Sequence, residues 1–420
     1  MAMKPMGPIP PDFLGHPDLP LGGQPARAWA EGGTPLFVYD FGVVAARIAR
    51  LREALPDGVD VHYAIKANPF LALLEAMAPL VDGLDVASGG ELAQALAVKP
   101  ADAISFAGPG KTDAELAAAI RAGATLHLES EGEAARALAI ASRSGTPPRV
   151  AVRVNPAFEL RGSGMRMGGR ASPFGVDAER VPALVRELLA AGADWRGFHI
   201  FSGSQALDGA AIIESQAATI ALASELADAV GAEPPLVNLG GGFGIPYFAG
   251  DRPLDVDAVG KALGEALASR RELGATRFAL ELGRWLVGEA GVYLTRVIDR
   301  KESRGETFLV CDGGLNHQLA ASGNFGTVVR RNYPLGVVGR MGALPDETVH
   351  VVGPLCTPLD RLGDSVALPR AEIGDLIAVF LAGAYGLSAS PQAFLGHAPA
   401  RELLVGDQPR DMRGKKPNVG

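Results

Sequence analysis

Lys66 closes an apolar, β-leaning run at residues 61–66, and Pro69 ends the segment three residues later. A lysine at the end of a strand is usually a solvated surface charge. In a partly apolar setting, however, desolvation lowers the pKa of the amine and makes it a nucleophile for carbonyl groups. The chemistry of Lys66 therefore depends on the groups that the fold brings near it.

Segment 238–244, NLGGGFG, is one candidate neighbour, because its glycines allow several backbone N–H groups to point at one anion. It could equally be a tight turn that needs glycine. In the ELGR segment, Glu281 can pair with a protonated ring nitrogen and Arg284 can bind a phosphate or a carboxylate. The alternative for these two residues is a structural salt bridge.

His199, in GFHIFS, could lay its ring on a planar cofactor, or it could be a core histidine satisfied by the backbone. Ser202 and Ser204 follow it with hydroxyl groups that suit a phosphate. Taken together, an amine, a phosphate nest, a partner for a ring nitrogen and a stacking ring describe a site for pyridoxal 5'-phosphate. The prediction requires a fold that brings all four to one place.

An alternation of β-like runs with Ala- and Leu-rich helical segments predicts such a fold. Strands that alternate with helices imply a parallel sheet, and eight units imply an α/β fold closed into a (β/α)8 TIM barrel rather than an open doubly wound sheet. Thr112 and Glu115 offer a capping box for one helix. The eight runs are residues 61–66, 83–88, 103–108, 124–130, 149–155, 197–202, 236–242 and 277–283.

In barrels of this kind the chemistry lies at the C-terminal ends of the strands, and a phosphate site commonly follows strands seven and eight. All residues at these ends would line one mouth. They are Lys66, Ser88, Glu129, Asn155, His199, Gly240, Gly241, Gly242 and Glu281.

Changes in composition and in helical or β-like pattern along the sequence predict four segments. A Pro- and Gly-rich arm at 1–35 is expected to pack on the C-terminal domain, and the barrel that binds the cofactor is expected at 36–284. β-like runs with few helical patterns predict a mostly β domain at 285–405. Residues 406–420 read as a mobile polar tail.

The composition indicates which classes of binding partner are not expected. With 420 residues, 48% hydrophobic residues and a net charge of -8, the chain is typical of a globular protein, and neither nucleic acid nor a membrane is expected as its partner. The start lacks the apolar run of a signal peptide. Two cysteines, Cys311 and Cys356, form no metal-ligand pattern. We expect no metal site and a cytoplasmic location.

Several motifs, in order, resemble those of the fold-type III pyridoxal-phosphate decarboxylases. This family includes diaminopimelate, ornithine and arginine decarboxylases and shares its barrel with alanine racemase. The resemblance extends from about residue 36 to residue 387. It rests on YAIKANP, GLDVASGGEL, GFHIFSGSQ, NLGGGFGIPY, ELGRWLVGEAG, CDGGLNH and VVGPLCTPLD.

The resemblance implies a decarboxylase in which Lys66 forms a Schiff base with the cofactor, His199 stacks on its ring and Glu281 keeps the ring nitrogen protonated. Asp85 and Arg153 would lie just behind these groups. The phosphate would be held by Gly240, Gly241, Gly242, Arg284, Tyr385 and either Ser202 or Ser204.

The resemblance also implies a head-to-tail homodimer with shared active sites. Cys356 would reach the site of a neighbouring subunit and return a proton after carbon dioxide leaves. Asp312 would approach the site from the C-terminal domain, and Thr357 stands where diaminopimelate and ornithine enzymes carry an acidic residue. The segment that helps to grip diaminopimelate in the family is replaced here by LAASG, residues 319–323.

Other departures point to a subgroup. HIFSGSQ is two residues longer than the usual motif, and a Gly-, Met- and Arg-rich loop occupies residues 162–177. Both resemble enzymes of biosynthetic clusters, including exosortase-associated loci and enzymes that act on amino acids tethered to carrier proteins. The loop would be a lid, a carrier-docking element or an ordinary surface loop. The substrate is then a diaminopimelate-like, basic or carrier-tethered amino acid.

Three other functions compete with this reading. An alanine racemase shares the barrel and the lysine but relies on a tyrosine from its second domain. A non-catalytic pyridoxal phosphate carrier resembles the barrel alone. A P-loop-like ATP-binding protein is suggested by SFAGPGKT at 105–112, although Ser105 replaces the first glycine of that pattern.

Overall fold

The computed structural model describes residues 3–160, 162, 165–166, 171–270, 273–323 and 330–406. The chain divides into two compact units, and each is described by itself. The first unit comprises Met1–Arg47, Pro246–Asp251 and Val287–Gly420, and the second comprises Ile48–Ile245 and Arg252–Leu286. From residue 407 on, the tail predicted at 406–420 lies outside the described residues, as does much of the loop predicted at 162–177.

The second unit is the predicted closed barrel of parallel strands. Each strand pairs in parallel with the next, and the last pairs with the first. The strands are buried almost throughout, as expected for a parallel sheet covered on both faces. They are β4 (Val59–Ala64), β5 (Gly83–Val86), β6 (Ile104–Phe106), β7 (Thr125–Leu128), β8 (Arg149–Asn155), β11 (Asp194–Ile200), β13 (Leu236–Gly241) and β14 (Arg277–Leu282).

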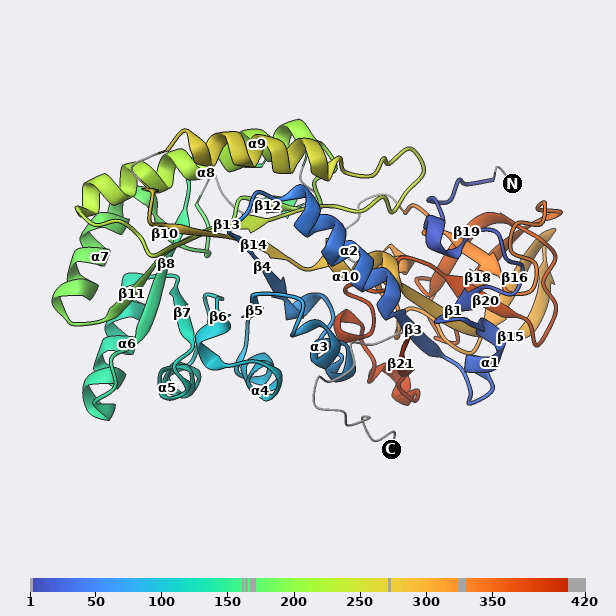
Figure 1. Ribbon diagram of the computed structural model, residues 1–420. Coiled ribbons are helices and arrows are strands. Elements are labelled where there is room, and N and C mark those ends of the chain that lie inside the picture. Colours follow the sequence, from blue (N-terminus) through green and yellow to red (C-terminus); the bar gives the residue numbers. More distant parts are fainter. Residues whose placement is uncertain are drawn as a thin grey trace, which may run out of the picture. The chain divides into compact units, whose positions relative to one another are not determined.

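Helices follow these strands and surround them (Figure 1), and from α3 to α9 each helix touches the next along the chain. The capping box predicted for Thr112 and Glu115 is confirmed at the start of α5. The helices are α3 (Leu71–Met77), α4 (Gly89–Val98), α5 (Asp113–Ala122), α6 (Glu131–Ser144), α7 (Val181–Ala190), α8 (Gly209–Val230), α9 (Val256–Ala268) and the short α10 (Arg284–Val287). Helix α2 (Phe41–Ala54) crosses from the first unit into the second.

Two segments that depart from the family motifs pair with one another in this unit. Strand β9 (Met165–Arg166) pairs antiparallel with β12 (Gly203–Ser204), which belongs to the longer HIFSGSQ segment. The chain then returns to the barrel through β10 (Val176–Asp177), which pairs in parallel with β8. Met165 and Arg166 of the loop after β8 thus lie beside the segment after β11.

The first unit is mostly β, as predicted. Its eight-stranded sheet is antiparallel except for the pairs β16–β18 and β3–β21. The strands are β3 (Leu36–Asp40), β15 (Gly291–Ser303), β16 (Glu306–Cys311), β17 (Leu335–Val337), β18 (Glu347–Val352), β19 (Arg361–Leu368), β20 (Leu376–Val379) and β21 (Arg401–Val405).

Strand β3 corrects the predicted start of the barrel at residue 36. It pairs with β15 and β21, so residues 36–40 belong to the β unit. The apolar run LFVYD suits any buried strand, and its partners lie more than 250 residues further along the chain. Local sequence therefore could not identify the sheet that it joins.

The N-terminal arm contacts the same unit. Lys4 pairs with Asp364, and the ring of Phe13 lies 5.8 Å from that of Phe380. The arm also contains the hairpin β1 (Pro20–Leu21) and β2 (Gln24–Pro25), followed by α1 (Ala26–Ala30). The Pro- and Gly-rich composition of the arm did not specify these contacts, because they depend on the tertiary structure.

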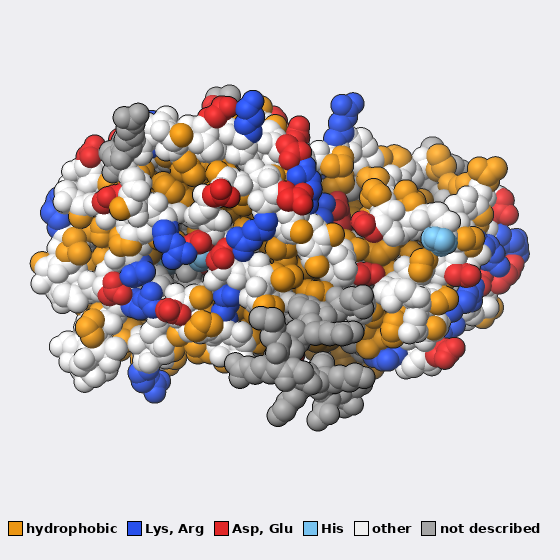
Figure 2. Space-filling view, in the orientation of Figure 1, with side chains coloured by type: hydrophobic (Ala, Val, Ile, Leu, Met, Phe, Trp, Pro, Cys, Tyr) orange, Lys and Arg blue, Asp and Glu red, His pale blue; other side chains and the backbone are white. Residues whose placement is uncertain are grey.

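The described surface mixes charges of both signs. Figure 2 shows Lys and Arg side chains interspersed with Asp and Glu on the visible face. Among the described helices, we find none with the length and apolar character that a bilayer crossing requires.

Candidate active site

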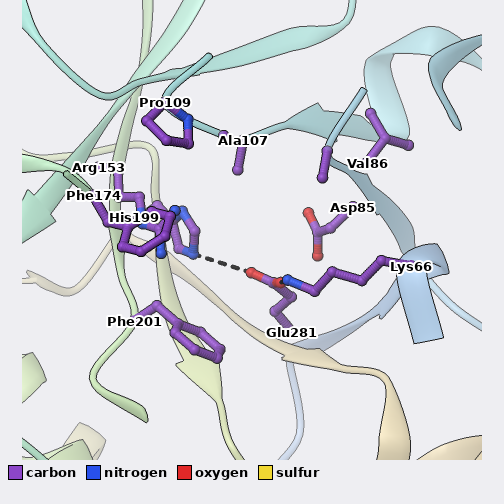
Figure 3. A pocket seen from close by; sticks show the side chains of 12 residues that line it. Lys66, Asp85, Val86, Ala107, Pro109, Arg153, Phe174, His199, Phe201 and Glu281 are labelled. Atoms are coloured by element: carbon purple, nitrogen blue, oxygen red, sulfur yellow. Dashed lines mark ion pairs between the residues drawn. The ribbon is translucent and has the colours of Figure 1, made fainter. Parts of the chain in front are cut away.

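Lys66 lies just beyond the barrel strand that precedes it. Strand β4 ends at Ala64, and Lys66 occupies a short 3-10 turn braced by the hydroxyl of Tyr63, which donates to the carbonyl of Asn68 at 3.0 Å. The side chain of Lys66 is 46% exposed and its amine points into a cavity (Figure 3). It is therefore neither a fully buried amine nor a surface charge directed at bulk solvent.

Glu281 connects Lys66 with His199. Its Oε1 lies 3.5 Å from Lys66 Nζ, and its Oε2 lies 3.0 Å from His199 Nε2. Burial alone would raise the pKa of the Glu281 carboxyl, but the Lys66 ammonium and the contact with His199 lower it far below its usual value. Glu281 is therefore an anion at neutral pH, as the sequence-based role requires.

Asp85 and His62 form a second buried pair beside this one. His62 Nδ1 lies 3.3 Å from Asp85 Oδ1. Burial alone would lower the pKa of His62, but the Asp85 carboxylate raises it, while burial raises the pKa of Asp85. Asp85 Oδ2 is buried without a hydrogen-bond partner among the described residues, and Asp85 lines the cavity (Figure 3). Such an oxygen suits a ligand that donates a hydrogen bond.

Arg153 is held by Glu129 on the neighbouring strand. Arg153 Nη1 lies 2.9 Å from Glu129 Oε1, and Glu129 also accepts from the backbone N–H groups of Gly108 and Gly175. Burial would raise the pKa of Glu129, but the Arg153 guanidinium lowers it. The guanidinium of Arg153 stacks 5.1 Å from the ring of Phe174, so Glu129 fixes both the arginine and the chain that carries this ring.

These groups surround a cavity of about 220 Å³ in the second unit. Phe201 supplies part of its wall, with its ring 5.8 Å from Lys66 Nζ. The lining residues are Lys66, Asp85, Val86, Ala87, Ala107, Gly108, Pro109, Arg153, Phe174, His199, Phe201 and Glu281.

The glycine turn after β13 has the close backbone approach expected of an anion nest. A β carbon on Gly241 would lie 1.9 Å from the carbonyl oxygen of Glu281. Gly242 has a φ of +85°, and its β carbon would lie 2.4 Å from the carbonyl oxygen of Gly203. On Gly240, a β carbon would lie 2.7 Å from the carbonyl oxygen of Ile200. β carbons are excluded here, and the Gly240 N–H already donates to Asn238 Oδ1 at 2.8 Å.

The two candidate serines differ in their surroundings. Ser202 Oγ lies 2.7 Å from Ser215 Oγ on α8. Ser204 Oγ is buried without a hydrogen-bond partner among the described residues. Two residues later, Ala206 N–H donates to the carbonyl of Gly242 at 2.9 Å, which places the Ser204 segment beside the glycine turn. A bare turn and an unsatisfied buried hydroxyl fit the phosphate group of pyridoxal phosphate. Arg284 begins α10, directly after Gly283.

Four predicted site residues belong to the first unit. Cys356 is exposed, and Thr357 Oγ1 accepts from the N–H of Leu359 at 3.3 Å. Asp312 accepts hydrogen bonds from the hydroxyls of Thr34 and Thr295 and from the N–H of Arg296. Tyr385 has a left-handed backbone, with a φ of 53°, which is uncommon outside glycine.

Some candidates from the strand ends have structural roles. Ser88 caps α4, where its Oγ accepts from the N–H of Glu91, and Asn155 donates to Asp177. Lys111, the lysine of the P-loop-like segment, is 3% exposed and lies 2.9 Å from Glu133 Oε1. A lysine paired in the interior cannot reach a phosphate. The ATP-binding alternative therefore lacks the lysine that would contact the phosphates of ATP. No cluster that could hold a metal ion occurs among the described residues.

Sequence reasoning missed three residues of the site. His127 Nδ1 lies 3.0 Å from His199 Nδ1, His62 pairs with Asp85, and Phe201 lines the cavity. His62 and His127 each occur within a predicted strand, so a search of strand interiors for polar residues would have found them. Phe201 carries no such signal, since an aromatic residue at a strand end is commonly part of the core.

Comparison with known proteins agrees with this geometry. Residues 41–288 match the family model described as the pyridoxal binding domain of pyridoxal-dependent decarboxylases. L-glutamyl-[BtrI acyl-carrier protein] decarboxylase of Niallia circulans is 36% identical over 88% of this chain and 88% of that protein. Diaminopimelate decarboxylase of Archaeoglobus fulgidus is 32% identical over 93% of this chain and 92% of that protein.

Solved structures show the same similarity. Diaminopimelate decarboxylase of M. jannaschii, in complex with L-lysine, has a TM-score of 0.81 and 28% identity, and the match covers 93% of this chain and 91% of that chain. The enzyme of Helicobacter pylori, also with L-lysine, has a TM-score of 0.79 and 27% identity over 91% of this chain and 94% of that chain.

Proposed function

Because the chain belongs to the family of pyridoxal-dependent decarboxylases, we propose that Lys66 binds the cofactor and that the groups around it remove the α-carboxylate of an amino acid. The cofactor of the family is pyridoxal phosphate, and the chain is an amino-acid decarboxylase rather than a racemase. The observation that carries the residue assignments is the contact of Glu281 with both Lys66 Nζ and His199 Nε2.

Pyridoxal phosphate, when bound, supplies an electron-accepting ring that makes loss of the α-carboxylate possible. The chain's own residues bind and orient this group. Lys66 offers an amine for the carbonyl of the cofactor, and His199 forms one wall for its ring. Glu281 is an anion in this site, which is the charge needed to hold a proton at the ring nitrogen. Asp85 and Arg153 border the same cavity, where they fix the position of what is bound.

We assign the phosphate to the turn formed by Gly240, Gly241 and Gly242 and to Ser204 rather than Ser202. Support comes from the buried Ser204 hydroxyl, which lacks a partner among the described residues, while the Ser202 hydroxyl contacts Ser215. Arg284 and Tyr385 are assigned to the phosphate only from the family motifs. Replacing Ser204 by alanine should therefore weaken cofactor binding more than the same change at Ser202.

We further propose a head-to-tail homodimer in which Cys356 of one subunit serves the site of the other. In decarboxylation the bond between the α-carbon and its carboxylate breaks, carbon dioxide leaves, and a proton must reach the carbon that remains. The Cys356 thiol would donate that proton. Its exposure agrees with this role, because a thiol that serves another subunit must be accessible in the isolated chain.

For the substrate, we propose an amino acid whose side chain ends in an uncharged linkage, such as a glutamyl group tethered to a carrier protein. Thr357 and the LAASG segment replace the residues that bind the distal charges of diaminopimelate. The Niallia circulans relative acts on a glutamyl group attached to an acyl-carrier protein. Asp312 agrees with this proposal, since its carboxylate already accepts three hydrogen bonds within its own unit.

The test measures release of carbon dioxide from glutamyl-carrier protein, diaminopimelate, ornithine, arginine and lysine. We expect turnover of the tethered substrate. The matched variant Thr357→Glu restores an acidic residue and should shift preference toward substrates with a distal ammonium. Efficient turnover of free diaminopimelate by the unaltered enzyme would contradict the proposed substrate class while leaving the reaction in place.

A further inference from the structure

His127 holds a place in the site that the assignments above leave unexplained. It lies on β7, and His199 lies on β11, with β8 between them in the barrel. Both side chains are almost fully buried, at 2% and 1% exposure. Their Nδ1 atoms are 3.0 Å apart, and their ring centroids are 4.6 Å apart with an interplanar angle of 45°. The two rings thus meet through a hydrogen bond rather than by stacking face to face.

The protons in this contact can be assigned from the neighbours. Ionised Glu281 offers only acceptor atoms, and its Oε2 lies 3.0 Å from His199 Nε2. A His199 ring that carries its hydrogen on Nε2, toward this carboxylate, has a bare Nδ1 that can accept a hydrogen bond from His127.

His127 suits the role of a neutral donor. Burial and the nearby His199 lower the pKa of His127 well below its usual value, so the ring carries no charge at neutral pH. A neutral imidazole with hydrogen on Nδ1 donates there and leaves Nε2 bare. The tautomer of a histidine is set by the hydrogen bond that its other nitrogen makes.

We propose that His127 is a positioning residue that donates from Nδ1 to His199 Nδ1, so that the His199 ring is held in place beside the cavity with its Nε2 toward Glu281. The inference rests on the proposed role of His199 as a wall of the cofactor site. It adds a residue on β7 to the proposed machinery and gives a role to a polar ring in the barrel interior.

The variants His127→Asn and His127→Leu separate hydrogen bonding from packing. Asparagine places an amide close to the position of Nδ1 and can still donate, whereas leucine fills the space without any donor. Thr125→Val is the matched control, since Thr125 lies two residues earlier on β7 and is also buried. Thermal unfolding of each holoenzyme identifies a variant that fails to fold. If His127→Leu fails to fold, His127→Asn can still be measured.

Three measurements on the holoenzyme test the positioning role of His127. They are NMR of the ring nitrogens in 15N-histidine-labelled protein, the rate of cofactor release, and kcat together with KM. We expect His199 to be neutral with hydrogen on Nε2 in the wild type, His127→Asn and Thr125→Val. His127→Leu should speed cofactor release and lower kcat by about 10-fold or more with little change in KM, because the His199 ring loses the contact that holds it.

Two results would overturn the inference: a wild-type His199 that is doubly protonated or protonated on Nδ1, or a His127→Leu variant that matches Thr125→Val in cofactor release and kcat. Failure of the proposed site would look different. In that case His199→Ala would retain cofactor and activity, while the NMR signals of the wild type would still report whether His199 Nδ1 accepts a hydrogen bond from His127.

Discussion

Glu281 is the residue on which the electrostatics of the site depend. It is buried, yet it is anionic because Lys66 and His199 both contact its carboxylate. A single charge thus contacts both the amine that we assign to the cofactor and the ring that we place beside it. Burying a carboxylate is costly unless it is paired, so the arrangement is stable only while all three groups are present.

Replacing Glu281 by glutamine removes this charge while keeping the shape. We expect kcat to fall by about 100-fold or more, because an amide cannot hold the proton at the ring nitrogen. Glu281→Asp is the matched control, since it keeps a carboxylate and should retain more activity. The measurement is steady-state release of carbon dioxide, and a glutamine variant within about threefold of the wild type would contradict the assigned role.

At the scale of single residues, the sequence predicted which residues border the cavity better than it predicted which side chains contact one another. Lys66, His199 and Glu281 were predicted from their positions at strand ends, and the cavity brings them together. Lys111 has an equally suggestive sequence context, yet it is paired in the interior with Glu133. The difference arises from side-chain packing between strands, which local sequence does not specify. The contact between His127 and His199 was missed for the same reason.

At the scale of elements, Glu129 ties β7 to β8 and to the chain at Gly175 that leads into β10. Because its folded-state pKa lies below its ordinary value of 4.5, Glu129 stabilises the fold above about pH 4.5, and this stabilisation is lost as the pH falls through the folded-state pKa. The sign follows from the unfolded chain binding more protons than the folded one in this window.

Glu129→Gln should therefore lower the free energy of unfolding at pH 7 by about 3 kcal/mol, because Arg153 is left as a buried charge without its partner. Its stability should also change less than that of the wild type as the pH falls below 4.5. Denaturant unfolding over this pH range checks both points. Glu131→Gln, whose partner Arg180 is exposed, should cost less than about 1 kcal/mol. Equal losses in the two variants would refute the bridging role.

The glycine turn allows a similar paired comparison. Gly242 and Gly231 both have a left-handed φ, but only Gly242 approaches another backbone closely. Alanine at either position should cost about 1 kcal/mol of backbone strain. Gly242→Ala should in addition weaken cofactor binding by about 10-fold or more, since the turn must move. Titration of the cofactor-free protein with pyridoxal phosphate measures this, and equal affinities in the two variants would exclude a phosphate nest here.

The elements were largely predictable because the barrel repeats one local pattern. Each predicted run became a strand, with ends shifted by a few residues, and periodicity alone sufficed. Strand β3 was assigned to the barrel because its apolar run fits either sheet, and its pairing with β15 and β21 depends on distant segments. The short pair β9–β12 was not predicted, since two-residue strands leave no periodic signal.

At the scale of the whole molecule, the proposed dimer predicts complementation between two inactive variants. Lys66→Ala lacks the amine, and Cys356→Ala lacks the proton donor. If a site takes Lys66 from one subunit and Cys356 from the other, mixed dimers contain one intact site, and an equal mixture should regain about a quarter of wild-type activity. The mixture is dissociated, reassociated and assayed. Activity no higher than that of the separate variants would contradict shared sites.

The central claim is that Lys66, among all lysines of this chain, binds the cofactor, and one measurement tests it directly. The purified enzyme is treated with borohydride, digested and analysed by mass spectrometry. We predict a phosphopyridoxyl group on the peptide that contains Lys66, and no such group in Lys66→Ala. A phosphopyridoxyl group on another lysine, such as Lys111, or a reduced wild-type enzyme without any labelled lysine after reconstitution, would contradict the account.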